Sequence, residues 1–259
     1  MENGLMSLSV ILITRNEAAR LRDVLQAVAW ADEIVVVDSG STDDTVAIAR
    51  SFGAKVAVTQ HWPGFGPQKN LALDQATGDW VLSIDADEVV TPALAQEIRH
   101  AMATPQGEVY ALPRLSFFLG RPMKHGGWWP DLVPRLFRRG HARFSDDLVH
   151  ERLVFDSRAI ALRNLLLHDT MPSLEDAISK MDRYSSAGAL RMHGQGRTSG
   201  VGRALAHGAW TFFRCYVLKA GFLDGAEGFV LAAANAQGTY YRYIKLWLLG
   251  RPPAQRTIP

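Results

Sequence analysis

Two acidic residues separated by one residue follow an apolar run in the first half of the chain. Residues 80–84 (Trp-Val-Leu-Ser-Ile) have the composition of a buried strand, and Asp85 and Asp87 come directly after it. Mg²⁺ and Mn²⁺ prefer oxygen ligands and share their coordination shell with substrate phosphates. Such a pair also occurs in solvated acidic turns. At the carboxyl end of a central strand, where open α/β sheets bind ligands, it predicts a site for a nucleotide and a divalent cation.

Other polar residues follow predicted strands in the same way. Thr14, Asn16 and Glu17 follow the first predicted strand, Asp38 follows the second, and Lys69 comes after the third. Because the carboxyl ends of parallel strands meet at one edge of a sheet, we expect these residues to line a single cleft with the acidic pair. Structural roles stay open for three of them: Asn16 as a helix cap, Asp38 as a turn residue and Lys69 as a solvated charge.

Strand and helix signals alternate through the first hundred residues. Strands are predicted at 7–13, 33–37, 55–58 and 80–84, and helices over residues 16–28, 41–49, 66–76 and 91–102. This alternation is typical of an α/β fold in which helices flank a mostly parallel sheet. Residues 108–169 show short strands and loops instead, and a further helix is expected to run towards Met192.

Capping signals mark the starts of four predicted helices. We expect Asn16 to cap the first helix, and Ser41 with Asp44 to form a capping box for the second. Thr91, followed by proline, and Ser173 give the start signals of two later helices.

Charge is unevenly distributed along the chain. The whole chain carries +2, but residues 191–259 contain nine Lys and Arg against two acids and thus carry +7. An anionic partner is therefore expected for this end. Cys215 is the single cysteine, so no intrachain disulfide can form, and the acidic N-terminus lacks the features of a signal peptide. We expect a cytoplasmic location.

The basic end contains two apolar segments, at residues 204–223 and 229–249, after a Gly-rich hinge at residues 193–203. Basic residues interrupt both segments, so neither supplies the ~20 uncharged residues of a spanning helix. Interfacial aromatics and basic residues favour helices that lie on an anionic membrane surface. Packing on the body of the protein or on a second subunit is the alternative. The basic residues form no recognisable nucleic-acid motif, so no nucleic-acid partner is expected.

The motifs together resemble a family 2 glycosyltransferase with the GT-A fold, over roughly residues 8–170. The resemblance is carried by Ile13-Thr14-Arg15-Asn16-Glu17, Val35-Val36-Val37-Asp38-Ser39-Gly40-Ser41-Thr42-Asp43, Lys69-Asn70 and Asp85-Ala86-Asp87-Glu88. More narrowly, the chain resembles bacterial lipopolysaccharide-core β-glycosyltransferases, the group that contains the inner-core heptose β-1,4-glucosyltransferase. That likeness is carried by Trp128-Trp129-Pro130-Asp131, Arg135-Leu136-Phe137, Val149-His150-Glu151 and Leu218-Lys219-Ala220-Gly221-Phe222-Leu223-Asp224-Gly225.

The resemblance implies a role for each matched residue. It assigns nucleotide binding to Thr14, Asn16, Glu17, Asp38, Lys69 and Asp85. It makes Asp87 the ligand of a divalent metal, Mg²⁺ or Mn²⁺, with Asp85 beside it and His168 as a further metal ligand. Neither Gly-x-Gly-x-x-Gly nor Gly-x-x-x-x-Gly-Lys-Ser/Thr occurs, which argues against dinucleotide-binding and P-loop proteins.

An inverting transfer needs a base for the acceptor hydroxyl, and the family places an acid downstream of the metal-binding motif. Glu151 matches that position, although His150-Glu151 departs from the more usual Glu-Asp pair. Asp131, Asp146 and Asp147 compete for this role, and a salt bridge to a nearby arginine is the structural alternative for Glu151.

The acceptor side is expected around Trp129, Asp131 and Arg135. Aromatic rings can stack on a sugar face, and guanidinium groups match phosphate geometry. Arg135, Arg138, Arg139 and Arg143 are thus candidates for binding pyrophosphate or a phosphorylated sugar, or else form a solvated basic loop.

These observations predict an inverting, metal-dependent glycosyltransferase on the inner face of the cell membrane. By resemblance, it would move glucose from UDP-glucose to a lipopolysaccharide-core or other lipid-linked saccharide. The expected organisation is a transferase domain at 1–192, with a nucleotide-binding half at 1–105 and an acceptor-side half at 106–192, then the hinge and membrane-associating helices at 204–259. A sugar nucleotidyltransferase and a non-catalytic membrane-associated scaffold are the alternative functions.

Overall fold

The computed structural model describes residues 6–146 and 151–251, which fall into two compact units. Up to Leu115, and again from Asp131 to His168, the chain belongs to the first unit. The second unit comprises Ser116–Pro130 and the residues from Asp169 onwards. The predicted functional boundaries at residues 105 and 192 stay a prediction. Asp147, a competing candidate base, and His150, which precedes Glu151 in the matched motif, lie outside the described residues.

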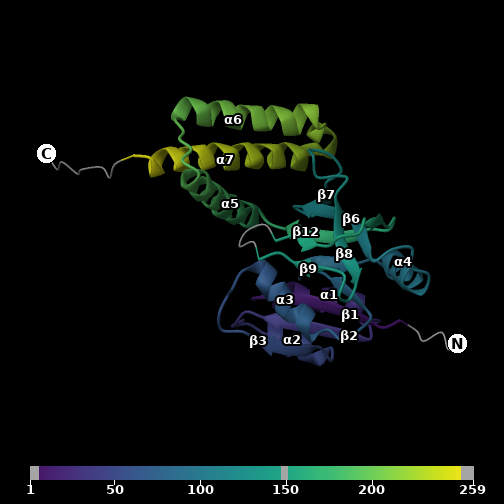
Figure 1. The fold of residues 1–259 in the computed structure, drawn as a ribbon. Coiled ribbons are helices and arrows are strands. Elements are labelled where there is room, and N and C mark those ends of the chain that lie inside the picture. The colour runs from purple at the N-terminus through teal and green to yellow at the C-terminus, as the bar shows by residue number, and fades with distance from the viewer. Residues whose placement is uncertain (1–5, 147–150, 252–259) are drawn as a thin grey trace. The chain divides into compact units, whose positions relative to one another are not determined.

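The first unit is built from alternating strands and helices, followed by further strands (Figure 1). Its elements are β1 (Leu8–Thr14), α1 (Ala18–Val28), β2 (Glu33–Asp38), α2 (Thr45–Ser51), β3 (Lys55–Val58), α3 (Phe65–Gln75), β4 (Trp80–Ser83), β5 (Glu88–Val90), α4 (Pro92–Ala103), β6 (Val109–Phe118), β8 (Leu132–Arg138), β9 (Arg143–Phe144), β10 (Leu153–Val154), β11 (Ile160–Ala161) and β12 (Leu166–Met171). The last residues of β6 and β12 belong to the second unit.

The first unit contains a mixed sheet. Strands β3, β2, β1 and β4 run parallel in that order, which confirms the parallel sheet predicted for the first hundred residues. Strand β8 then pairs antiparallel with both β4 and β6, and β5 pairs antiparallel with β12. The antiparallel strands bring residues from far along the chain to the carboxyl end of β4.

Alternating side chains of β1 pack into two hydrophobic clusters, as expected for a strand covered on both faces. Val10 and Leu12 pack in one cluster with apolar residues of α1 and α4. Ile11 belongs to the other cluster, which includes Leu73 of α3. The predicted apolar stripe of the first helix is buried as expected: Leu21, Val24, Leu25 and Val28.

Two of the predicted helix caps are wrong. Helix α1 starts after Glu17, and the Asn16 side chain instead accepts a hydrogen bond from the Thr42 backbone at 2.8 Å. Helix α2 starts after Asp44, while the Ser41 hydroxyl donates to Asp38. The Asn16 bond joins the two strand-end loops, whereas the Ser41 bond lies within the loop after β2, and both take the place of capping. The Thr91 cap is confirmed, with its hydroxyl 3.2 Å from the Leu94 nitrogen.

The second unit consists of a short hairpin strand and a set of helices (Figure 1). Its elements are β7 (Arg121–Pro122), α5 (Leu174–Gly194), α6 (Val201–Phe213), the π-helical turn η1 (Arg214–Leu218), the 3₁₀ turn η2 (Gly221–Asp224) and α7 (Gly225–Leu249). The Ser173 cap of α5 is confirmed by a 3.1 Å bond from the Asp176 nitrogen.

Helices α6 and α7 pack closely against each other. A Cβ atom on Gly208 would stand 3.3 Å from the Ala236 carbonyl oxygen, and the hydroxyls of Thr211 and Thr239 are 3.2 Å apart. Among the described residues, we find no helix with both the length and the apolar character required to cross a membrane.

Candidate active site

The loops after β1 and β2 are tied together at the carboxyl edge of the sheet. Thr14 and Asp38 are register partners, and the Thr14 hydroxyl donates to the Asp38 carboxylate at 2.9 Å. That carboxylate is fully buried and also accepts from the backbone nitrogen of Ser41 at 2.7 Å and from its hydroxyl. Asp38 thus orders the turn from a fully buried position.

Asn16 and Glu17 lie in the adjoining loop. Asn16 has a positive φ of 56°, a backbone conformation that asparagine tolerates better than most residues. The Glu17 nitrogen donates to the Thr45 hydroxyl at 2.8 Å. The structure therefore brings Thr14, Asn16, Glu17 and Asp38 to one edge, as predicted, and their contacts with a nucleotide stay a prediction.

Lys69 joins two of the predicted site acids. Its side chain is only 5% exposed, and Nζ lies 2.9 Å from Asp85 Oδ1 and 3.1 Å from Glu151 Oε1. The neighbouring Asn70 amide exchanges hydrogen bonds of 2.9 and 3.0 Å with the Phe144 backbone and so fixes α3 against β9. Lys69 is therefore a buried linker of carboxylates, and the solvated alternative is wrong.

Gly66 explains how α3 comes so close to the segment that carries Glu151. A Cβ atom at Gly66 would lie 1.8 Å from the Ser145 carbonyl oxygen and 3.4 Å from Glu151 Cβ. The first distance is far below any real contact, so only glycine fits this packing.

Arg135 binds the other side of Asp85. Strand β8 pairs with β4, so Arg135 stands across from the end of the strand that precedes the acidic pair. Its Nη2 contacts Asp85 Oδ2, and it lies 2.6 Å from Glu88 Oε1. Glu88, which is fully buried, also lies 3.1 Å from Arg114 Nη1, and Arg114 holds Asp131 at 2.8 Å.

These contacts form one continuous set of ion pairs, hereafter the charged cluster. In order of contact, its members are Glu151, Lys69, Asp85, Arg135, Glu88, Arg114 and Asp131. Burial opposes ionisation of Asp85, but Arg135 and Lys69 outweigh it and hold the pKa of that carboxyl well below its usual range. Burial likewise disfavours the charged form of Arg135, and Asp85 and Glu88 reverse this and raise its pKa.

Asp87 and His168 contact each other beside the cluster. The β5–β12 pairing sets His168 opposite Glu88, and His168 Nε2 is 3.4 Å from Asp87 Oδ2. Among the described residues, no group of three or more His, Cys, Asp or Glu is arranged to hold a metal. One carboxylate and one imidazole nevertheless fit a cation that takes its other ligands from substrate phosphates and water. Both oxygens of Asp85 are ion-paired, so Asp85 could ligate a cation only by exchanging one of these contacts.

Three of the four arginines considered for phosphate binding have other partners. Arg143 pairs with Asp74 at 2.8 Å, Arg139 Nε donates to the Gly78 carbonyl at 2.8 Å, and Arg138 lies 3.7 Å from Glu108. Only Arg135 of this set belongs to the charged cluster.

Trp128 and Trp129 lie in the second unit, three and two residues before Asp131 along the chain. Trp128 packs edge to face on Phe118, with ring centroids 6.4 Å apart. It therefore anchors its loop, which leaves Trp129 as the candidate for stacking on a sugar.

Sequence reasoning missed Glu88 and Arg114. Glu88 directly follows the acidic pair, and Arg114 is a single charge within the apolar run of β6. A lone arginine in a strand that is otherwise buried is a usable signal, because it requires a buried acid as its partner.

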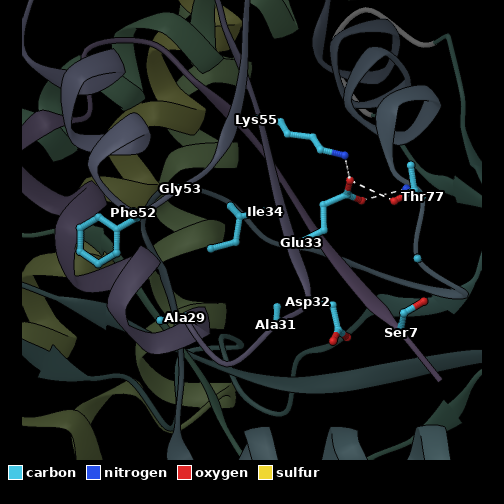
Figure 2. Close-up of a pocket in the computed structure, with 11 residues that line it drawn as sticks. Ser7, Ala29, Ala31, Asp32, Glu33, Ile34, Phe52, Gly53, Lys55 and Thr77 are labelled. Carbon is cyan, nitrogen blue, oxygen red and sulfur yellow. Dashed lines mark hydrogen bonds and ion pairs between the residues drawn. The ribbon is translucent and has the colours of Figure 1, made fainter. Parts of the chain in front are cut away.

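A cavity of about 330 Å³ lies at the other edge of the sheet, by the amino ends of β1 and β2 (Figure 2). Figure 2 shows the Glu33 carboxylate between Lys55 and Thr77. Burial opposes ionisation of Glu33, but hydrogen bonds from Lys55, Ser9 and Thr77 lower its pKa to about 2. All the donors come from the protein itself, so Glu33 serves to join β2, β3 and the segment before β4.

The fold and the charged cluster define an α/β protein whose candidate functional groups gather at the carboxyl edge of a sheet. The chain matches the model described as "Glycosyl transferase family 2" over residues 9–158, and it belongs to that family. It is therefore a glycosyltransferase, which decides against the nucleotidyltransferase and scaffold alternatives.

Relatives of similar length support this assignment. An uncharacterized glycosyltransferase of Rickettsia felis is 31% identical, over 92% of this chain and 89% of the relative. The lipopolysaccharide core biosynthesis glycosyltransferase LpsC of Rhizobium meliloti is 28% identical, over 93% of this chain and 92% of the relative. The structure of S. aureus TarS 1-349 shares the fold, with a TM-score of 0.51, 16% identity and coverage of 96% of this chain and 93% of that one.

Proposed function

We propose that this chain is an inverting, metal-dependent hexosyltransferase that acts on a lipid-linked saccharide. In its most specific form, the proposal is transfer of glucose from UDP-glucose to a saccharide of the lipopolysaccharide-core type. The name of the LpsC relative supports this acceptor class. The observation that carries the proposal is Lys69, which holds Asp85 and Glu151 together at the carboxyl edge of the sheet.

The donor would bind at the loops after β1, β2 and β4. Thr14, Asn16, Glu17 and Asp38 are the residues proposed to face the nucleoside, and Lys69 and Asp85 the residues proposed beside its ribose and phosphates. Asp87 and His168 would hold Mg²⁺ or Mn²⁺. When bound, such a cation supplies the positive charge that stabilises a departing nucleoside diphosphate.

Glu151 is the proposed base. Its side chain is 21% exposed and its Oε1 contacts Lys69, so an acceptor can approach this side chain. The carboxylate takes the proton of the acceptor hydroxyl as the new bond to the anomeric carbon forms and the bond to the diphosphate breaks. Asp131 is a competing candidate for the base. Its Oδ2 lies 2.8 Å from Arg114 Nη2 and 2.9 Å from Arg114 Nε. We therefore retain Glu151 as the base and assign Asp131, with Trp129 and Arg135, to the acceptor side.

Contact with an anionic membrane surface is the second part of the proposal. Helix α6 and the turn η1 expose three large apolar side chains, Leu205, Phe213 and Val217. Arg203 and Arg214 on the same segment are also exposed. Apolar side chains beside basic ones match the boundary of an anionic lipid layer, where each basic residue adds about 1 kcal/mol. The protein would then bind peripherally at the inner face of the membrane.

Glu151→Gln tests the proposed base. The variant keeps the size of the side chain, so binding of the nucleotide sugar should persist, measured by thermal shift with Mn²⁺ present. Transfer to lipopolysaccharide-core oligosaccharide should fall by about 10²–10⁴-fold, the usual contribution of general-base catalysis. Asp146→Asn changes a competing candidate base and should retain wild-type transfer, and wild-type transfer rates in Glu151→Gln would refute the assignment.

A further inference from the structure

The turn between the last two helices carries a motif to which no role has yet been attached. It is the segment Lys219-Ala220-Gly221-Phe222-Leu223-Asp224-Gly225, which joins η1 to α7 (Figure 1). Its backbone is tightly packed: a Cβ atom on Gly221 would stand 2.7 Å from the Cys215 carbonyl oxygen, and one on Gly228 would stand 2.0 Å from the Gly221 carbonyl oxygen. These glycines fix the position of Asp224.

Asp224 binds the loop that follows β7. Its side chain is 5% exposed and accepts bonds from the backbone nitrogens of Lys124 at 3.3 Å and His125 at 2.8 Å. The third contact is His125 Nδ1, at 2.7 Å. The Gly126 nitrogen also donates to the Lys219 carbonyl at 2.8 Å, so the turn holds three consecutive residues of the loop.

The Asp224 contact determines the orientation of the histidine ring. An ionised carboxylate only accepts hydrogen bonds, so Nδ1 carries a hydrogen and Nε2 is the ring atom left to meet a ligand. The His125 side chain is 35% exposed, so a ligand can reach it. The pair has the form of an oriented histidine, in which a buried acid fixes the ring and the distal nitrogen makes the functional contact.

The surroundings of the pair favour a negatively charged ligand. Lys124 and Lys219 are exposed beside it, and Arg121 lies so close that its Nη1 would be 3.0 Å from a Cβ atom on Gly225. Gly126 and Gly127 have φ values of 67° and 90°, which leave the backbone open to close approach. The same loop continues to Trp129, the candidate for stacking on a sugar.

We propose that His125, oriented by Asp224, binds an anionic group of the acceptor saccharide, with Arg121, Lys124 and Lys219 adding positive charge. Asp224 is a positioning residue and His125 makes the contact. The inference rests on the proposed function in taking the ligand to be a saccharide acceptor. It also gives the C-terminal helices a role in acceptor selection that is separate from membrane binding.

The test measures equilibrium binding of deacylated lipopolysaccharide-core oligosaccharide by calorimetry, so that it does not depend on transfer. His125→Gln should weaken binding at least tenfold, and Asp224→Asn should do the same. Glu175→Gln is the matched control, because it removes an exposed acid of the second unit that lies in the first turn of α5 and is not one of the residues of the proposed site, and it should change binding less than twofold. Oligosaccharide that has been dephosphorylated or carboxyl-reduced should bind the wild type more weakly in at least one of the two forms.

Kinetics separate positioning from a general structural effect. Asp224→Asn should raise the KM for the oligosaccharide at least tenfold and change kcat less than threefold. If Asp224→Asn does not fold, His125→Gln on the exposed loop carries the test by itself. Equal oligosaccharide binding by wild type and His125→Gln, including no binding by either, would overturn this inference. Absence of transfer by the wild type, with binding intact, would overturn the proposed function alone.

Discussion

Replacing Glu33 by glutamine should destabilise the protein in a pH-dependent manner. The pKa of Glu33 falls from 4.5 to about 2 on folding, because bonds from Lys55, Ser9 and Thr77 outweigh the effect of burial. A difference of this size corresponds to about 3 kcal/mol of folding free energy in favour of the ionised form. Glutamine keeps the shape but removes the charge, so the free energy of unfolding at pH 7 should fall by about 2–3 kcal/mol.

The sign of the pH effect follows from the direction of the shift. A carboxyl with a lowered pKa stabilises the fold above the unfolded-state value of 4.5, and that stabilisation is lost as pH falls towards 2. Urea unfolding, followed by circular dichroism from pH 7 to pH 3, should show the gap between wild type and Glu33→Gln closing below pH 4.5. Asp74→Asn breaks an exposed ion pair with Arg143 and should cost about 0–1 kcal/mol. A gap that stays constant across this pH range would refute the reasoning.

Two further predictions concern the cluster and the helices. Glu88→Gln removes the buried acid that holds Arg135, so it should lower the free energy of unfolding by about 3 kcal/mol. It should also reduce kcat about 10²-fold through misplacement of the site, and unchanged kcat with lowered stability would show that Glu88 has no positioning role. Leu205→Ser with Phe213→Ser should reduce sedimentation with anionic liposomes at least tenfold, because two large apolar side chains no longer enter the lipid. Val58→Ser, an exposed apolar residue of the first unit, should have no effect, and equal sedimentation of all three proteins would contradict the membrane role.

The first hundred residues were predictable because their signals are local. Strand β4 and the acids after it follow from an apolar run and its abrupt end, and Thr91 with its following proline marks the start of α4 correctly. The same local rules failed at Asn16 and Ser41. There, the buried Asp38 carboxylate and the neighbouring loop compete for the capping groups, and that competition depends on the pairing of β1 with β2.

Which residues form ion pairs with one another in the charged cluster could not be predicted from the sequence. Arg135 reaches Asp85 because β8 pairs antiparallel with β4, and Arg114 reaches Glu88 across the same sheet. Such pairs are separated by tens of residues, and their identity is set by strand register. The sequence identified candidate groups such as Lys69 and Glu151, and the fold decides that these two are partners.

Binding of UDP with and without MnCl₂, to wild type and to Asp87→Asn, tests the central claim most directly. If Asp87 and His168 hold a cation that bridges to the diphosphate, Mn²⁺ should tighten UDP binding to the wild type at least tenfold in calorimetry. Asp87→Asn should lose that gain and keep the metal-free affinity. An equal effect of Mn²⁺ on both proteins, or none on either, would contradict the account.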